Sequence, residues 1–135
     1  MNYLPVLVAG VASFLVGWLW HSPLLFLDQW MRLSGFPKPK VVTPEMKKKM
    51  MRSMAFGLVA NLVAAGVLSC IVTQIGKTDM VSTLSVASWI WLGFVVTTLA
   101  NGPLWEDKSV KLFFFNATYH LVVVAVMAVV LSLML

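Results

Sequence analysis

The stretch Gly17-Trp18-Leu19-Trp20-His21-Ser22-Pro23-Leu24 closes the first long apolar run of the chain. It places a titratable histidine, two tryptophans and a helix-breaking proline where a membrane-spanning helix would reach the lipid boundary. A looser copy, Leu99-Ala100-Asn101-Gly102-Pro103-Leu104, closes a later apolar run. Both stretches therefore mark the end of an expected membrane-spanning helix.

The composition is that of an integral membrane protein. Of the 135 residues, 60% are hydrophobic and 11% are charged, and the mean hydropathy is +0.89. Soluble domains carry about 25% charged residues. Uncharged runs long enough to cross a ~30 Å hydrocarbon core occur four times. We therefore expect an all-α membrane protein of one domain, residues 1–135, with transmembrane helices at about 3–22, 45–76, 81–104 and 110–135.

Basic residues gather in the first long connection, and this bias predicts the orientation. Seven of the ten Lys and Arg residues lie between Arg32 and Arg52. The positive-inside rule then makes a loop at about 28–52 cytoplasmic, with both termini outside, in a bacterial inner membrane. Four cationic side chains are expected to contact anionic lipid headgroups: Lys47, Lys48, Lys49 and Arg52. No aromatic-rich soluble module accompanies them, so we expect no nucleic-acid partner.

The two apolar endings also suggest an internal repeat. His21-Ser22-Pro23-Leu24 aligns with Asn101-Gly102-Pro103-Leu104, and Asn61-Leu62-Val63 aligns with His120-Leu121-Val122. This pattern predicts two helical hairpins of the same orientation, related by a pseudo-twofold axis along the membrane normal. Chance similarity between apolar helices is the alternative.

Polar side chains recur at the cytoplasmic halves of the expected helices. A polar side chain that faces lipid is costly, so these side chains are expected to point inward and toward one another. The candidate cluster contains His21, Asn61, Asn101, Asn116 and His120. The aromatic residues expected to flank it are Trp20, Trp89, Trp91 and Tyr119. The cluster could join helices through hydrogen bonds of ~0.6 kcal/mol each, or it could bind or conduct a ligand.

Other side-chain patterns bear on packing and chemistry. Ala9, Ser13 and Gly17 recur every four residues, which lets another helix approach closely and suggests a homo-oligomer, with a dimer favoured. A haem with His21 and His120 as axial ligands is conceivable but disfavoured, so no cofactor is expected. No carboxylate or second cysteine lies near enough to support a metal site. No nucleophile–base pair suggests an enzyme, and no catalytic residue is expected.

Three stretches of the chain resemble a family of small bacterial membrane proteins. The stretches are Trp20-His21-Ser22-Pro23-Leu24-Leu25-Phe26, Trp91-Leu92-Gly93-Phe94-Val95-Val96-Thr97-Thr98, and Leu112-Phe113-Phe114-Phe115-Asn116-Ala117 with its continuation through Tyr119-His120-Leu121-Val122. The family is catalogued as domain of unknown function seventeen-sixty-one. The resemblance implies a four-helix fold and no activity. Tyr is usual in that family where this chain has His21, which weakens any mechanism that requires a histidine at this position, and haem binding most of all.

Two functions remain open at this point. The repeat, the one-sided polar cluster and the breaks at Pro23 and Pro103 favour a small oligomeric transporter or channel-like protein. The alternative is a structural or accessory membrane subunit, in which the polar cluster only holds helices together.

Overall fold

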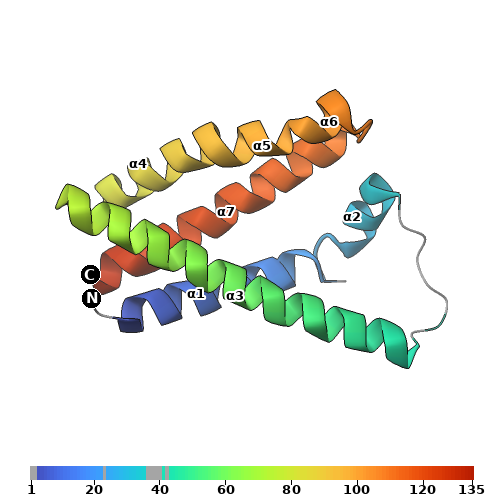
Figure 1. The fold of residues 1–135 in the computed structure, drawn as a ribbon, viewed down its shortest axis with the longest axis horizontal. Coiled ribbons are helices and arrows are strands. Elements are labelled where there is room, and N and C mark those ends of the chain that lie inside the picture. Colours follow the sequence, from blue (N-terminus) through green and yellow to red (C-terminus); the bar gives the residue numbers. More distant parts are fainter. Residues whose placement is uncertain (1–2, 23, 36–40, 42) are drawn as a thin grey trace.

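The computed structural model describes residues 3–22, 24–35, 41 and 43–135, and these residues form helices joined by short turns (Figure 1). The elements are α1 (Tyr3–Trp20), α2 (Leu27–Ser34), α3 (Pro44–Ile75), α4 (Met80–Ile90), the π-helix η1 (Trp91–Val96), α5 (Thr97–Leu99), α6 (Asn101–Trp105) and α7 (Val110–Met134). Within the described residues, four stretches are long and apolar enough to cross a membrane: α1, α3, α4 through α6, and α7. The expected all-α membrane fold with four spans is confirmed.

Local sequence explains where the long helices begin. The Thr43 hydroxyl accepts a hydrogen bond from the Met46 N–H, and Pro44 occupies the first position of α3. The Asp79 carboxylate caps α4 by accepting from the Ser82 N–H at 3.1 Å. Hydrogen bonds from Ser82 also hold the pKa of the exposed Asp79 carboxyl below its usual value. The Ser109 hydroxyl caps α7 in the same way. Each cap satisfies amide groups that a helix leaves unpaired at its start.

The four spans pack in the order α3, α1, α7, α4. Helix α1 packs along both α3 and α7, and α7 packs against α4 on its other side. Helices α3 and α4 diverge from the turn that joins them (Figure 1). The buried core lies between these spans and consists mainly of small and aliphatic side chains: Ala9, Ala65, Leu68, Val72, Ala87, Val123, Met127, Ala128 and Leu131.

The two ends of the bundle differ in what they carry. The start of α1 and the end of α7 lie at the same end as the α3–α4 turn, whereas α2, the start of α3 and the α6–α7 connection lie at the opposite end (Figure 1). The connections rich in Lys and Arg are therefore on one side, as four membrane crossings require. We call this side the basic end; the side of the membrane that it faces stays a prediction.

The small-residue face of α1 is used inside the chain. Gly10 and Gly17 are buried, and the Ser13 hydroxyl donates to the Val123 carbonyl at 3.5 Å. A Cβ atom at Gly10 would lie 3.0 Å from the Leu62 Cα, so α1 and α3 cross closely there. The expectation that this face of α1 pairs between subunits is wrong, because α3 and α7 already cover it. A homo-oligomer stays a prediction.

Three further differences from the sequence-based expectations concern the connections and the third span. The segment expected as a loop at 28–52 contains α2 and the first turns of α3. The expected third helix is interrupted by η1 and by a break at Ala100. The expected break at Pro23 and part of the expected basic loop, residues 36–40 and 42, fall outside the described residues; α1 ends at Trp20 and α2 begins at Leu27.

The packing is less symmetric than an internal twofold axis would make it. Such an axis would exchange the α1–α7 interface with the α3–α4 interface. Helix α1 instead packs along much of α7, while α3 and α4 touch over a short stretch. The repeat remains a prediction from sequence, and the two halves are not packed equivalently.

Candidate functional site

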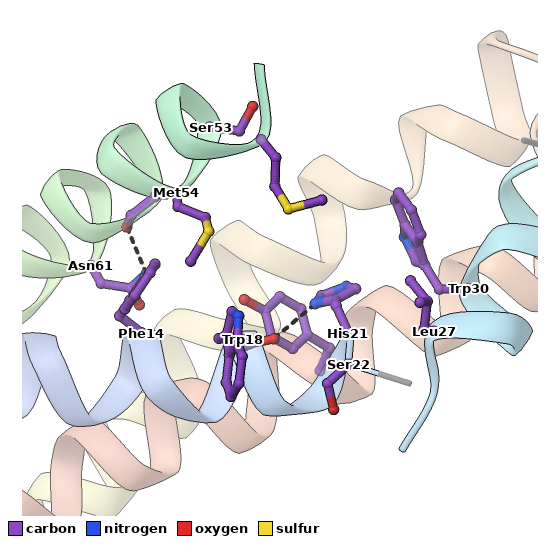
Figure 2. A pocket seen from close by; sticks show the side chains of 13 residues that line it. Phe14, Trp18, His21, Ser22, Leu27, Trp30, Ser53, Met54 and Asn61 are labelled. Atoms are coloured by element: carbon purple, nitrogen blue, oxygen red, sulfur yellow. Dashed lines mark hydrogen bonds between the residues drawn. The ribbon is translucent and has the colours of Figure 1, made fainter. Parts of the chain in front are cut away.

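A cavity of about 580 Å³ opens at the basic end, between α1, α2, α3 and α7. Figure 2 shows Phe14 and Asn61 at its inner end, Leu27 and Trp30 at its outer end, and His21 between them. Most of its wall is aromatic, thioether or aliphatic: Phe14, Trp18, Leu27, Trp30, Met50 and Met54. A few polar side chains interrupt this wall: His21, Ser22, Ser53, Asn61 and Tyr119. We call it the His21 cavity.

His21 is held in one orientation by its own helix and by two rings. Its Nδ1 lies 3.0 Å from the Gly17 carbonyl oxygen (Figure 2). A carbonyl oxygen can only accept a hydrogen bond, so Nδ1 must carry the proton. In the neutral side chain, Nε2 is then an acceptor. Edge-to-face contacts with Tyr119 and Trp30, at centroid distances of 4.7 and 5.5 Å, fix the plane of the imidazole.

Asn61 marks the inner end of the cavity. Its Nδ2 donates to the Gly57 carbonyl at 2.8 Å, one turn earlier in α3. This bond leaves the side-chain carbonyl oxygen available as an acceptor. Gly57 lines the cavity beside it, and a Cβ there would meet only Phe14, at 3.8 Å. The cavity is therefore widened at this position by the absence of a side chain.

Tyr119 connects the cavity to an aromatic cluster behind it. A Cβ at Gly17 would lie 2.5 Å from the Tyr119 hydroxyl oxygen, so the phenol occupies the space left by this glycine. The cluster behind it contains Trp20, Phe26 and Phe115; the Trp20 and Phe26 rings lie 4.6 Å apart. The Trp20 indole N–H is buried and has no hydrogen-bond partner among the described residues.

The five predicted polar residues do not converge on one site. His21 and Asn61 line the His21 cavity, but Asn101 and Asn116 line a separate cavity of about 280 Å³ at the junction of α6 and α7. His120 lines neither of these cavities; its ring contacts that of Tyr119 at 4.8 Å. The reason for the separate position of Asn101 is the packing order, because α7 lies between α1 and the span that contains Asn101.

Two of the predicted flanking aromatics lie elsewhere. The Trp91 indole N–H donates to the Ala117 carbonyl at 2.8 Å and joins η1 to α7. The Trp89 side chain is 70% exposed on the surface of the bundle. Neither residue lines the His21 cavity. Trp20 and Tyr119, in contrast, lie beside His21 or its aromatic neighbours.

Sequence reasoning missed part of the cavity wall. The site predicted from sequence includes neither Trp30 nor the two methionines Met50 and Met54, although all three line the cavity. The four-residue spacing of Met46, Met50 and Met54 was the available signal, because such residues share one helix face. What could not be seen in sequence was that α1 and α2 close over this face.

The described residues contain no group of three or more His, Cys, Asp or Glu side chains that could hold a metal ion. A haem ligated by His21 and His120 would require both imidazoles to face a common space. His21 lines the cavity and His120 does not. This cavity therefore offers only one of the two imidazoles, and the absence of a cofactor stays a prediction.

The fold and the cavity define a small integral membrane protein with four spans and an open, largely apolar cavity at the basic end. The chain belongs to the family described as Protein of unknown function (DUF1761), which matches residues 4–132. No curated protein and no solved structure matches the chain.

Proposed function

We propose that this protein binds an amphiphilic small molecule in the His21 cavity, as the ligand site of a small membrane transporter. The observation that carries the proposal is the cavity itself. Its volume of about 580 Å³ falls in the range of small-molecule sites, roughly 300–1,000 Å³. Such sites have mostly apolar walls with a few polar groups that orient the ligand, and His21, Asn61 and Tyr119 are suited to that role.

The hydrogen bonds of His21 and Asn61 argue against a purely structural role for these two residues. Each donates to a carbonyl four residues earlier in its own helix. Bonds of this kind satisfy a polar group inside the membrane without joining two helices. The His21 and Asn61 side chains keep acceptor atoms for a ligand, whereas interhelical hydrogen bonding comes from Trp91 and Ser13.

Interruptions in the spans favour a transporter over a rigid subunit. The chain leaves α1 at the cavity and turns into α2, and the third span contains the π-helix η1. Broken membrane helices are typical of transporter binding sites, and single π-helical turns occur frequently at functional positions. A continuous ion pathway is less well supported, because the polar residues are divided between two cavities.

Ligand binding can be tested by filling the inner end of the cavity at Gly57, where a side chain has room to enter. We expect Gly57→Leu to lower the amount of co-purified or added amphiphile at least tenfold, because the new side chain occupies the inner end of the cavity. Native mass spectrometry of the purified full chain measures the bound ligand directly.

Gly66→Leu is the matched control. Gly66 lies on the same helix, and a Cβ there would also meet a single side chain, Val6, at 3.8 Å. It does not line the His21 cavity. Equal retention of amphiphile by both variants would show that the ligand lies elsewhere, and absence of saturable binding to the unmodified chain would refute the proposal.

We further propose that the protein lies in an inner membrane with the mouth of the cavity on the cytoplasmic side. The reason is that most Lys and Arg residues lie at the basic end, and such residues favour the cytoplasmic side. The test uses a Cys70→Ala background with either Lys48→Cys or Lys77→Cys. In right-side-out vesicles, an impermeant thiol reagent is expected to label the cysteine at position 77 and to reach position 48 only after lysis. The reverse labelling pattern would invert the orientation.

A further inference from the structure

We infer that the occupant of the His21 cavity is a single-chain anionic amphiphile, such as a long-chain carboxylate. Its head group lies at the outer end near Lys47, and its chain runs inward toward Phe14 and Asn61. This inference rests on the proposed function, since it names the class of ligand for the same site.

The position of Lys47 on α3 is the main evidence for an anionic ligand. The cavity-lining residues Met50, Met54, Gly57 and Asn61 follow one another at spacings of three or four, so they form one stripe along the helix. Lys47 lies three positions before Met50 and seven before Met54, on the N-terminal continuation of this stripe. A long flexible ammonium side chain therefore stands at the outer end of the cavity.

The other cations of this segment lie on different faces. At about 100° per residue, Lys48 and Arg52 are on the side of α3 opposite the cavity stripe. Lys49 is at the edge of the stripe, one turn before Ser53. All four cationic residues are exposed. The segment predicted from sequence as one lipid-binding group thus divides into Lys47, which adjoins the cavity, and Lys48 and Arg52, which face away from it.

The charge and the composition of the cavity wall both favour a ligand with an anionic head group and an apolar chain. The described lining contains no Asp or Glu, so nothing in it opposes an anionic head group. The methionine and aromatic wall suits a flexible apolar chain, because thioether side chains adapt to irregular shapes. The volume of about 580 Å³ is that of a site for a drug-sized ligand, which suits one acyl chain.

The experiment compares an anionic probe with a neutral probe of equal length. The full chain is placed in nanodiscs of zwitterionic phosphatidylcholine and titrated with bromohexadecanoate or with bromohexadecanol. Bromine quenches tryptophan fluorescence, and Trp18 and Trp30 line the cavity. The specific signal is the saturable quenching that Gly57→Leu removes and Gly66→Leu retains.

Lys47→Gln is expected to weaken binding of the carboxylate about fivefold and to leave binding of the alcohol unchanged, because only the carboxylate is attracted to the ammonium group. Lys48→Gln also removes one positive charge, but from the opposite face of α3. It is expected to change neither the binding of the carboxylate nor that of the alcohol. Added salt is expected to weaken binding of the carboxylate alone.

The outcomes separate the two proposals. If both probes bind with equal affinity and Lys47→Gln has no selective effect, the anionic ligand is refuted and the cavity remains a binding site. Equal losses in Lys47→Gln and Lys48→Gln would indicate general surface attraction and also refute the inference. Displacement of the carboxylate by an equal concentration of phosphatidylglycerol would identify a two-chain lipid instead. If neither probe gives saturable quenching, both the anionic ligand and the proposed function are refuted.

Discussion

Gly10→Ala is expected to destabilise the protein by about 1–3 kcal/mol, the usual cost of inserting atoms into a closely packed interface. The new Cβ would lie 2.5 Å from the Leu62 Cδ2 and 3.0 Å from its Cα. The Leu62 side chain can rotate away, but its backbone cannot, so α1 and α3 must separate. This cost exceeds the ~0.5–1 kcal/mol that alanine contributes over glycine inside a helix. Thermal unfolding of the purified chain in detergent measures the change.

Gly66→Ala is the control on the same helix pair. Gly66 of α3 faces Val6 of α1, and its Cβ would lie 3.8 Å from the Val6 side chain, an ordinary van der Waals distance. This variant is expected to be as stable as the parent or slightly more stable. If both alanine variants behave alike, the close crossing of α1 and α3 at Gly10 is contradicted. Leu62→Ala in the Gly10→Ala background is expected to recover only part of the loss, because the clash with the backbone at position 62 remains.

Gly17→Ala is expected to lower the stability of the protein about as much as Gly10→Ala does. This loss depends on the hydroxyl group of Tyr119. The added Cβ would lie 2.5 Å from the Tyr119 hydroxyl oxygen and 3.3 Å from its Cε1. Tyr119→Phe removes the oxygen and leaves the milder overlap with the ring. We therefore expect the double variant to recover most of the stability, with a coupling energy of about 1–2 kcal/mol in a double-mutant cycle.

The same set of variants can also be compared by their binding of an amphiphile in the cavity. The Tyr119 ring packs edge-to-face on His21, so a displaced phenol would move the wall of the His21 cavity. Gly17→Ala is expected to weaken amphiphile binding, and Tyr119→Phe is expected to recover only part of it, because the hydroxyl group that lines the cavity is lost. Additive effects of the two substitutions would mean that Tyr119 does not occupy the space beside Gly17.

The spans and their boundaries could be predicted because they depend on local properties of the chain. Uncharged runs determine which segments cross the membrane, and residues such as Thr43 and Pro44 determine where a helix begins. The close approach at Ala9, Ser13 and Gly17 was also visible, because small residues at four-residue spacing share one helix face. The identity of the helix that would approach was not visible.

The candidate site could be predicted only in part. His21 and Asn61 were selected from the sequence as polar residues near one end of the spans, and the structure brings both to one cavity. Asn101, Asn116 and His120 satisfied the same sequence criteria but lie elsewhere, because α7 separates α1 from the third span. The depth of a residue in the membrane follows from its distance to a helix end, whereas its direction follows from the rotation of the helix against its neighbours.

By itself, the sequence determined that this protein crosses a membrane four times, with most of its Lys and Arg residues at one end and His21 at the end of the first span. The tertiary structure decided that α1 packs between α3 and α7, and that α2 and the methionine face of α3 close a cavity over His21. The physical reason is that hydropathy and capping act along one helix. The choice of neighbours depends on steric fit between surfaces that are almost equally apolar, and no single helix contains that information.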